Sequence, residues 1–171
     1  MLEIKTLGGL ILSEAGGNKI ELHLTKAQAL LVFLAAENRD IPRAEVTALL
    51  WPESAEKQAM TSLRVILSSL RKYVGDYLEI SRTHIKFNPA KSVYFDGWDL
   101  EGKINQGDIC SALSLYQGDF LTGFEIQDSA SFDEWCLMTQ EYYRGLLTAA
   151  LHKAISKAVE DRDLEFGLQL S

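Results

Sequence analysis

Residues 57–75 combine basic side chains with hydroxyl side chains and include no acidic residue. The cations of this stretch are Lys57, Arg64, Arg71 and Lys72. Arginine can bind the O6 and N7 atoms of guanine in the major groove of DNA, and both basic residue types bind phosphate. Hydroxyl groups can donate to, or accept from, the edges of the bases. The chemistry that this stretch favours is recognition of double-stranded DNA.

The spacing of apolar residues predicts the element that positions these side chains. Apolar residues recur at steps of three and four, which predicts a helix over about 56–74 with one buried stripe. The remaining side chains lie off that stripe, as they also would on a solvated helix face, so spacing alone leaves both interpretations open. Arg64 is the candidate for guanine and Val65 for a thymine methyl group. The candidate DNA contacts on this helix are Thr61, Arg64, Val65, Ser68, Arg71 and Lys72, the last two as phosphate contacts.

A hairpin is expected to follow this helix. Residues 77–80 and 84–87 alternate between apolar and polar and predict two strands joined by a polar tip. Arg82 and Thr83 lie at the tip, where a wing can enter the minor groove or lie on phosphate. An ordinary polar turn has the same composition, and the sequence does not separate the two interpretations.

Two helices are expected before the basic one. Thr25 and Gln28 have the spacing of a capping box, and Pro42 suits the first turn of the second helix. That helix is expected to end at Trp51, which we expect to pack in the core, and Ser54 is the expected cap of the third helix. Residues at helix starts can bind phosphate or serve only as caps and surface residues. The candidate phosphate contacts of this kind are Thr25, Lys26, Arg43 and Lys57.

Short strands are expected at the N-terminus. Residues 2–5 and 20–24 alternate between apolar and polar, with glycine turns between them, and predict an antiparallel meander. The order of elements is then strands, three helices and a hairpin. This is the order of a winged helix-turn-helix with an N-terminal antiparallel sheet, and it predicts an α+β DNA-binding domain over residues 1–95.

The charge of the chain divides at the same place. The net charge is −7, which taken whole argues against nucleic acid as a partner. Residues 1–90 hold 11 Lys and Arg against 10 Asp and Glu, whereas residues 91–171 hold six against 14. Asn88-Pro89 and Asp96-Gly97 look like turn signals near the change in charge. We therefore expect a second, acidic domain over residues 96–171.

The second half is predicted to be helical. One helix is expected over 108–116, a loop over 118–124, and a long helix from 131 to about 159. A further helix is expected to begin at 163, and because it has no cap before the last residue we expect the natural protein to continue. Aromatic residues of this half can pack as a core or line a ligand pocket, and packing is the favoured interpretation. They are Tyr116, Phe120, Phe124, Phe132 and Trp135.

Several blocks resemble a known family. Residues 48–52, 61–63 and 68–72 look like the N-terminal region of the SARP-type bacterial activators, in which an OmpR-type winged helix precedes a bacterial transcriptional activator domain. The second half resembles the hallmark run of that activator domain. The matching residues are Ala112, Leu113, Tyr116, Gly118, Phe120, Leu121, Gly123, Phe124, Phe132, Glu134 and Trp135.

This resemblance implies a cytoplasmic transcription regulator. Its third helix would enter the major groove at promoter repeats, its hairpin tip would meet the minor groove, and a tetratricopeptide-like helical domain would follow. The family also implies contact with RNA polymerase, for which Trp51, Glu53 and Ser54 are the candidates. The helical second half could serve as a platform for dimerisation, so a homodimer is a further candidate assembly. The sequence departs from many members at Ser68-Ser69, where the recognition helix is usually richer in arginine.

Other function classes find little support in the sequence. There is no phosphate-binding G-x-x-x-x-G-K-[ST] loop, no H-E-x-x-H and no Cys-x-x-Cys, so we expect neither an enzyme nor a cofactor or metal site. Cys110 and Cys136 fit a reducing compartment, and no apolar run is long enough to span a membrane. The expected function is a sequence-specific DNA-binding regulator, and the family resemblance implies an activator. The alternative is a helical protein-interaction adaptor whose winged helix does not bind DNA.

Overall fold

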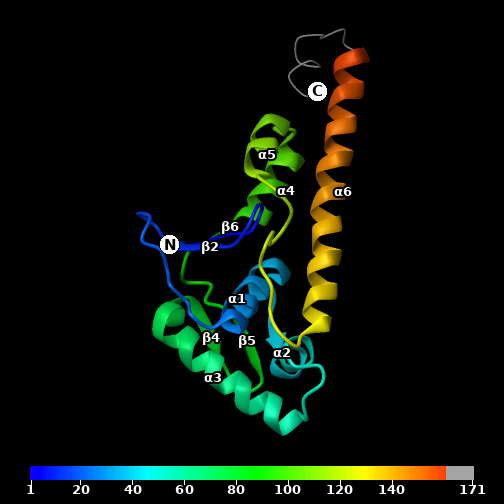
Figure 1. The fold of residues 1–171 in the computed structure, drawn as a ribbon. Helices are drawn as coiled ribbons and strands as arrows, with labels where there is room; N and C mark the ends of the chain where they lie inside the picture. The colour runs from blue at the N-terminus through cyan, green and yellow to red at the C-terminus, as the bar shows by residue number, and fades with distance from the viewer. Residues whose placement is uncertain (161–171) are drawn as a thin grey trace.

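The structure is a computed structural model that describes residues 1–160, so the helix expected from 163 lies outside the described residues. It is a mixed α+β fold with two small sheets and a helical C-terminal part (Figure 1). The strands are β1 (Leu2–Lys5), β2 (Ile11–Glu14), β3 (Ile41–Pro42), β4 (Leu78–Ile80), β5 (His84–Phe87) and β6 (Val93–Phe95). The helices are α1 (Thr25–Glu37), α2 (Arg43–Leu50), α3 (Glu56–Val74), α4 (Asp96–Gln106), α5 (Ile109–Leu115) and α6 (Ala130–Glu160), with a 3-10 turn η1 (Gly75–Tyr77) after α3.

The first sheet differs from the antiparallel meander that the sequence predicts. Its strand order is β2-β1-β6, in which β1 and β2 are antiparallel but β1 and β6 are parallel. Residues 20–24 form no strand. Their alternation reflects the burial of Leu22 alone, whose carbonyl accepts a hydrogen bond from the Gln28 side chain instead of a strand partner.

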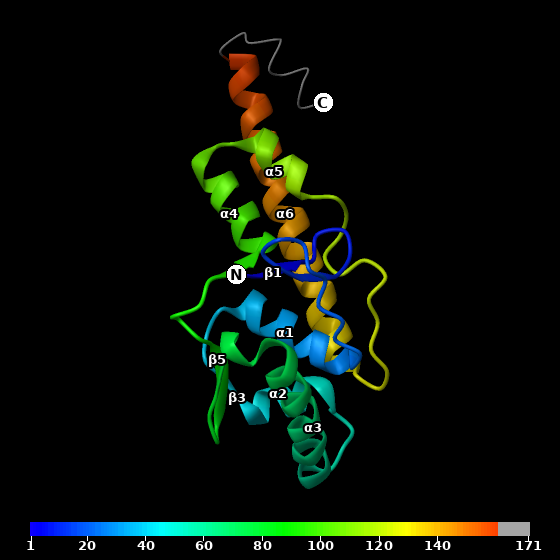
Figure 2. The same ribbon diagram turned by 90° about the vertical axis from the view of Figure 1, so that its left-hand side faces the viewer.

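The second sheet belongs to the three-helix region. Its order is β3-β5-β4, and both of its pairings are antiparallel. The hairpin of β4 and β5 is the one expected from the sequence, and it lies beside α3 (Figures 1 and 2). Helix α3 has the predicted bounds and the predicted buried stripe. The stripe consists of Leu63, Leu67, Leu70 and Val74, joined by Ala59 and Ile66.

The helix starts differ from the expected caps. Thr25 is the first residue of α1 and not its cap, and no side chain caps this helix. Pro42 precedes α2 instead of lying in its first turn, and Ala55, not Ser54, precedes α3. Burial takes the place of capping in α1, because an unbroken run from Ala29 to Ala35 is buried and makes this helix the centre of the core.

Helix α4 begins where the sequence suggests a turn. Asp96 is its first residue, and its buried carboxylate accepts hydrogen bonds from Thr6 N at 2.6 Å, Thr6 Oγ1 at 2.9 Å and Leu7 N at 2.8 Å. A carboxylate is favourable in the first turn of a helix. Gly97 follows because any Cβ there would collide with the hydroxyl of Tyr143. The Asp96-Gly97 pair therefore serves a tight helix start and not a turn.

Helix α6 runs along most of the molecule, with α4 and α5 beside its middle part, α1 and α2 beside its start, and α3 beyond that start (Figures 1 and 2). The ring of Trp135 packs edge-on against Phe33 of α1 at a centroid distance of 5.1 Å, and its Nε1 donates to Glu37 Oε1 at 3.2 Å. Phe120 and Phe132 also pack on Trp135 and are at most 1% exposed. The expected aromatic core is thus confirmed, and it joins α6 to α1. The division at residues 95 and 96 stays a prediction.

Candidate nucleic-acid interface

The exposed face of α3 carries all six side chains that the sequence analysis selected from this helix. Val65 is an apolar side chain with 58% of its surface exposed, which is unusual on a helix whose other apolar residues are buried or half-buried. The Thr61 hydroxyl donates to the Lys57 carbonyl and keeps its acceptor capacity. Six exposed side chains lie on this face, namely Thr61, Arg64, Val65, Ser68, Arg71 and Lys72.

Position along α3 separates these side chains into two groups. Arg71 and Lys72 lie in the last turn, where positive charge also stabilises the helix through its dipole. Lys72 Nζ lies 5.3 Å from the centroid of the Tyr73 ring. Arg64 lies two turns earlier, near the middle of the helix. A helix in the major groove would present its middle to base edges and its ends to phosphates.

The hairpin tip is exposed and internally hydrogen-bonded. Arg82 and Thr83 are both exposed. The Ser81 hydroxyl accepts from Thr83 N at 3.2 Å and from His84 N at 2.8 Å, and it donates to the His84 carbonyl. The tip is therefore a defined turn that holds Arg82 outward.

Arg43 connects the start of α2 to this turn and to α3. Its Nη2 donates to the Ser81 carbonyl at 2.6 Å. Desolvation lowers the pKa of Arg43, and the nearby positive charges of Arg71 and Arg64 lower this pKa further. The Nε atom of Arg43 is buried and has no hydrogen-bond partner. Arg43 thus contacts the hairpin and lies within electrostatic range of two arginines of α3.

The ion pairs within residues 1–160 leave out the candidate cations, as they also leave out Lys5, Lys19, Lys91, Lys153 and Lys157. Within residues 1–160, every ion pair uses one of four other cations, and none includes a candidate contact from α1, α2, α3 or the hairpin tip. Among the residues that the structure describes, the candidate cations therefore have no ion-paired carboxylate to displace before they bind an anion. The paired cations are Arg39, Lys86, Lys103 and Arg144.

The start of α1 is arranged differently. Lys26 Nζ donates to the Leu50 carbonyl at 2.6 Å and lies 5.1 Å from the centroid of the Trp51 ring. Desolvation lowers the pKa of Lys26, while Asp128 acts in the opposite direction. The ammonium group is thus engaged within the protein. Thr25 is exposed beside it.

A groove of about 600 Å³ separates the start of α1 from the middle of α3. One of its walls is the loop 125–127, which precedes α6 and comes from the acidic half of the chain. Ile126 is buried in this contact, whereas Glu125 is exposed. The sequence gives no signal for this contact, because the loop is about sixty residues away from Val65 on the opposite wall.

The candidate polymerase contacts lie in the connection between α2 and α3. Trp51 is half-buried and packs against the core, as expected, and it also lines the groove. Glu53 is exposed, and Ser54 is half-buried, with its N–H bonded to the Trp51 carbonyl at 3.1 Å. The connection is thus an ordered turn beside the exposed face of α3.

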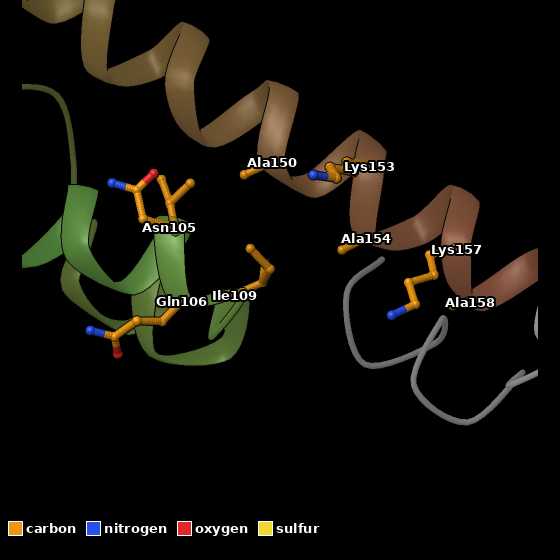
Figure 3. A pocket seen from close by; sticks show the side chains of 10 residues that line it. Asn105, Gln106, Ile109, Ala150, Lys153, Ala154, Lys157 and Ala158 are labelled. Atoms are coloured by element: carbon orange, nitrogen blue, oxygen red, sulfur yellow. The ribbon is translucent and has the colours of Figure 1, made fainter.

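A second cavity lies far from these residues. It has a volume of about 660 Å³ and lies between the turn joining α4 to α5 and the C-terminal part of α6 (Figure 3). None of the residues selected from the sequence lines it. Lys153 and Lys157 stand on its α6 side, together with Ala150, Ala154 and Ala158.

The described residues form no cluster of metal ligands, and burial keeps the Cys136 thiol in its neutral form. No group of three or more His, Cys, Asp or Glu side chains within residues 1–160 is placed to hold a metal ion. Burial raises the pKa of the Cys136 thiol to about 12, so this thiol stays protonated at neutral pH. Among the helices of this part of the chain, none is both long and apolar enough to cross a membrane.

Comparison with known proteins identifies a structural neighbour. The fold matches that of Mycobacterium tuberculosis EmbR, solved in complex with a low affinity phosphopeptide, with a TM-score of 0.66 at 18% sequence identity. The chain has a SARP-like fold. The match covers 95% of this chain but spans about half of the EmbR chain, 49%. No protein-family model matches the sequence, and no curated protein matches it either.

Proposed function

We propose that the chain is a sequence-specific, double-stranded-DNA-binding transcription regulator. The observation that carries this proposal is the exposed, acid-free face of α3, whose cations have no ion-pair partner within residues 1–160. DNA presents a dense row of phosphates, and unpaired cations bind it with release of counterions. The SARP-like fold supports the same proposal, since EmbR is a regulator of that family.

In this proposal α1, α2, α3 and the β4–β5 hairpin form a winged helix-turn-helix. Helix α3 enters the major groove, with Arg64 and Val65 at base edges. Arg71 and Lys72 bind phosphate near the end of the helix, and Arg82 reaches the neighbouring backbone or minor groove from the hairpin tip. Lys57, at the other end of α3, is a further candidate for phosphate.

The proposal extends to activation, as the family resemblance implies. A cytoplasmic activator would bind promoter repeats as a homodimer and contact RNA polymerase through the connection between α2 and α3. The exposed position of Glu53 beside the DNA-reading face of α3 supports this role, because a protein bound to adjacent DNA can reach it. Trp51 and Ser54 would fix the shape of that connection.

Selection of duplexes from random DNA tests the proposal, followed by titration of an enriched duplex at several salt concentrations. The paired substitution Arg71→Gln with Lys72→Gln should reduce the slope of log K against log salt by about 1.8, since each phosphate contact contributes about 0.9. The matched control is Lys153→Gln with Lys157→Gln, which removes the same charge from exposed positions on α6. Absence of any enriched duplex, or equal effects of the two pairs, would contradict the proposal and favour the adaptor alternative.

A further inference from the structure

The start of α2 is joined to the hairpin through the backbone. Strand β3 pairs with β5, with Pro42 opposite His84. The next residue, Arg43, continues the pairing, because its N–H donates to the Thr83 carbonyl at 2.8 Å. The hairpin is therefore attached to α2 immediately beside its tip.

The Arg43 side chain makes a second connection, to the Ser81 carbonyl at 2.6 Å. Within residues 1–160 it donates the one side-chain hydrogen bond that reaches residues 81–84 from another element. The carbonyls that Arg43 binds belong to Ser81 and Thr83, and Arg82 lies between them. Arg43 thus holds the backbone on both sides of the exposed wing arginine.

The electrostatic surroundings of Arg43 are those of a functional residue. An arginine placed for stability alone is expected to face a carboxylate, whereas Arg43 lies near Arg64 and Arg71. Its Nε is buried without a partner, which costs free energy in the unbound protein. A bound phosphate chain would offset the repulsion among these three guanidinium groups.

We propose that Arg43 is a positioning residue that fixes the hairpin tip relative to α3. This inference rests on the proposed DNA binding. In it, Arg43 holds the turn in the position from which Arg82 contacts the same DNA duplex as Arg64 and Arg71. This role differs from that of a direct phosphate contact, because Arg43 acts through Arg82. The two roles predict different results when both arginines are changed.

The first test uses the free protein. Arg43→Met keeps the length of the aliphatic stem and removes the donors, and its matched control is Arg39→Met, an exposed arginine paired with Glu37 and Glu45. Backbone order parameters of Arg82 and Thr83, measured by NMR relaxation, should fall below the rigid value of about 0.85 in the Arg43 variant alone, although the hydrogen bonds of the Ser81 hydroxyl remain. Unchanged order parameters overturn the proposal, whatever happens with DNA.

The second test is a double-mutant cycle on a duplex that the wild-type chain enriches from random DNA. Arg43→Met, Arg82→Ala and the double variant should each reduce the salt slope by about 0.9, because all three lose the same phosphate contact. Independent contacts would instead give a reduction of about 1.8 in the double variant, which overturns the positioning role. Thermal unfolding of each variant shows whether the fold is kept.

The two tests separate this inference from the proposed function. Should the wild-type chain enrich no duplex, the proposed function fails, and with it the statement that Arg43 serves DNA binding. Reduced order parameters in that case support only the part of the inference that concerns the turn. Enrichment by the wild type together with an additive cycle leaves DNA binding intact and refutes the role of Arg43.

Discussion

The exposed face of α3 and the surface of the α4–α6 region differ in the signs of the charges that they carry. On α3, residues 57–75 carry cations and no acid, and these cations have no ion-pair partner within the described chain. In the helical region, Lys103 pairs with Asp108, and Arg144 pairs with Asp119 and Glu141, whereas Lys153 and Lys157 take part in no ion pair within the described residues. Cations that already have carboxylate partners are poor ligands for a polyanion, so the absence of acid among the cations of residues 57–75, and not the net charge of the chain, makes this face the candidate for binding a polyanion.

The distance between the two regions matters as well. Helix α3 lies at the end of the molecule opposite to the C-terminal end of α6 (Figures 1 and 2). Most acidic residues of the chain lie after residue 90. Salt at physiological ionic strength largely screens exposed charges that are more than about 8–10 Å apart. The net charge of −7 therefore says little about the anion that α3 can bind.

The largest expected effect concerns the aromatic core that joins the two regions. Trp135→Ala removes the packing on Phe33 and the hydrogen bond to Glu37, and should reduce the free energy of unfolding by about 3–5 kcal/mol. Urea denaturation measures this loss. The matched control on the same helix is Leu137→Ala, which is 59% exposed and should change stability by less than about 0.5 kcal/mol. Similar losses in both variants would mean that α6 is not held through Trp135.

The next effect separates binding from stability on α3. Arg64→Ala should weaken binding to an enriched duplex by about 1–3 kcal/mol and relax the preference at one base pair, because a bidentate contact with guanine is lost. Its thermal unfolding should match that of the wild type, since Arg64 has no ion pair within the described residues. Arg144→Ala is the control, with no expected effect on DNA. Equal losses of affinity from both substitutions would erase the contrast between the two regions.

A pH effect is expected in the helical region. Hydrogen bonds from Tyr116 and Arg144 lower the pKa of the Asp119 carboxyl below its ordinary value of 3.8. A lowered pKa in the folded state gives stability that is present above the unfolded value and is lost as the pH falls through the folded value. Wild type should therefore exceed Asp119→Asn in stability from neutral pH down to about pH 4–5, and the difference should shrink below that. Urea denaturation between pH 3 and 7 measures the difference, and a constant one would contradict the assignment.

The smallest effect concerns the acidic loop beside the groove. Glu125→Gln with Asp128→Asn should raise the affinity for random-sequence duplex by less than about 1 kcal/mol, because these exposed carboxylates repel phosphates near α1 and α3. Glu134→Gln with Glu141→Gln removes the same charge from exposed positions on α6 and should change this affinity less. Fluorescence anisotropy at low salt compares the pairs. No gain in the loop variant would show that the acidic half does not limit non-specific binding.

Local periodicity predicted the elements that carry the candidate site. The bounds of α3 and the hairpin follow from steps of three and four residues and from strict alternation, because each of these elements buries one face of its own. The start of α6 was predicted from the capping-box spacing of Ser131 and Glu134, and the helix begins one residue earlier, at Ala130, so Ser131 lies inside it. The same spacing of apolar residues was enough to predict that the Arg64 and Arg82 side chains are exposed.

Contacts between distant segments could not be predicted in this way. Asp96-Gly97 has the composition of a turn, and only its partners Thr6 and Tyr143 make it a helix start. Nothing in the sequence near Lys26 reveals that its ammonium group binds a backbone carbonyl at the end of α2. The connection from Arg43 to the hairpin turn depends on β3, a strand of only two residues.

The parallel pairing of β1 with β6 has a consequence for the order of folding. Leu2 pairs with Val93, so the sheet that contains β1 is complete only when residues near the end of the first half have joined it. Strands β1 and β2 alone form a two-stranded ribbon, which is marginally stable in water, whereas α1–α3 and their hairpin depend on more local contacts. Since α4 begins at the residue after β6, closure of this sheet would also set the direction of α4. We therefore expect the pairing of β6 with β1 to complete the first half of the chain and, in the same step, to position α4 and the helices that follow it.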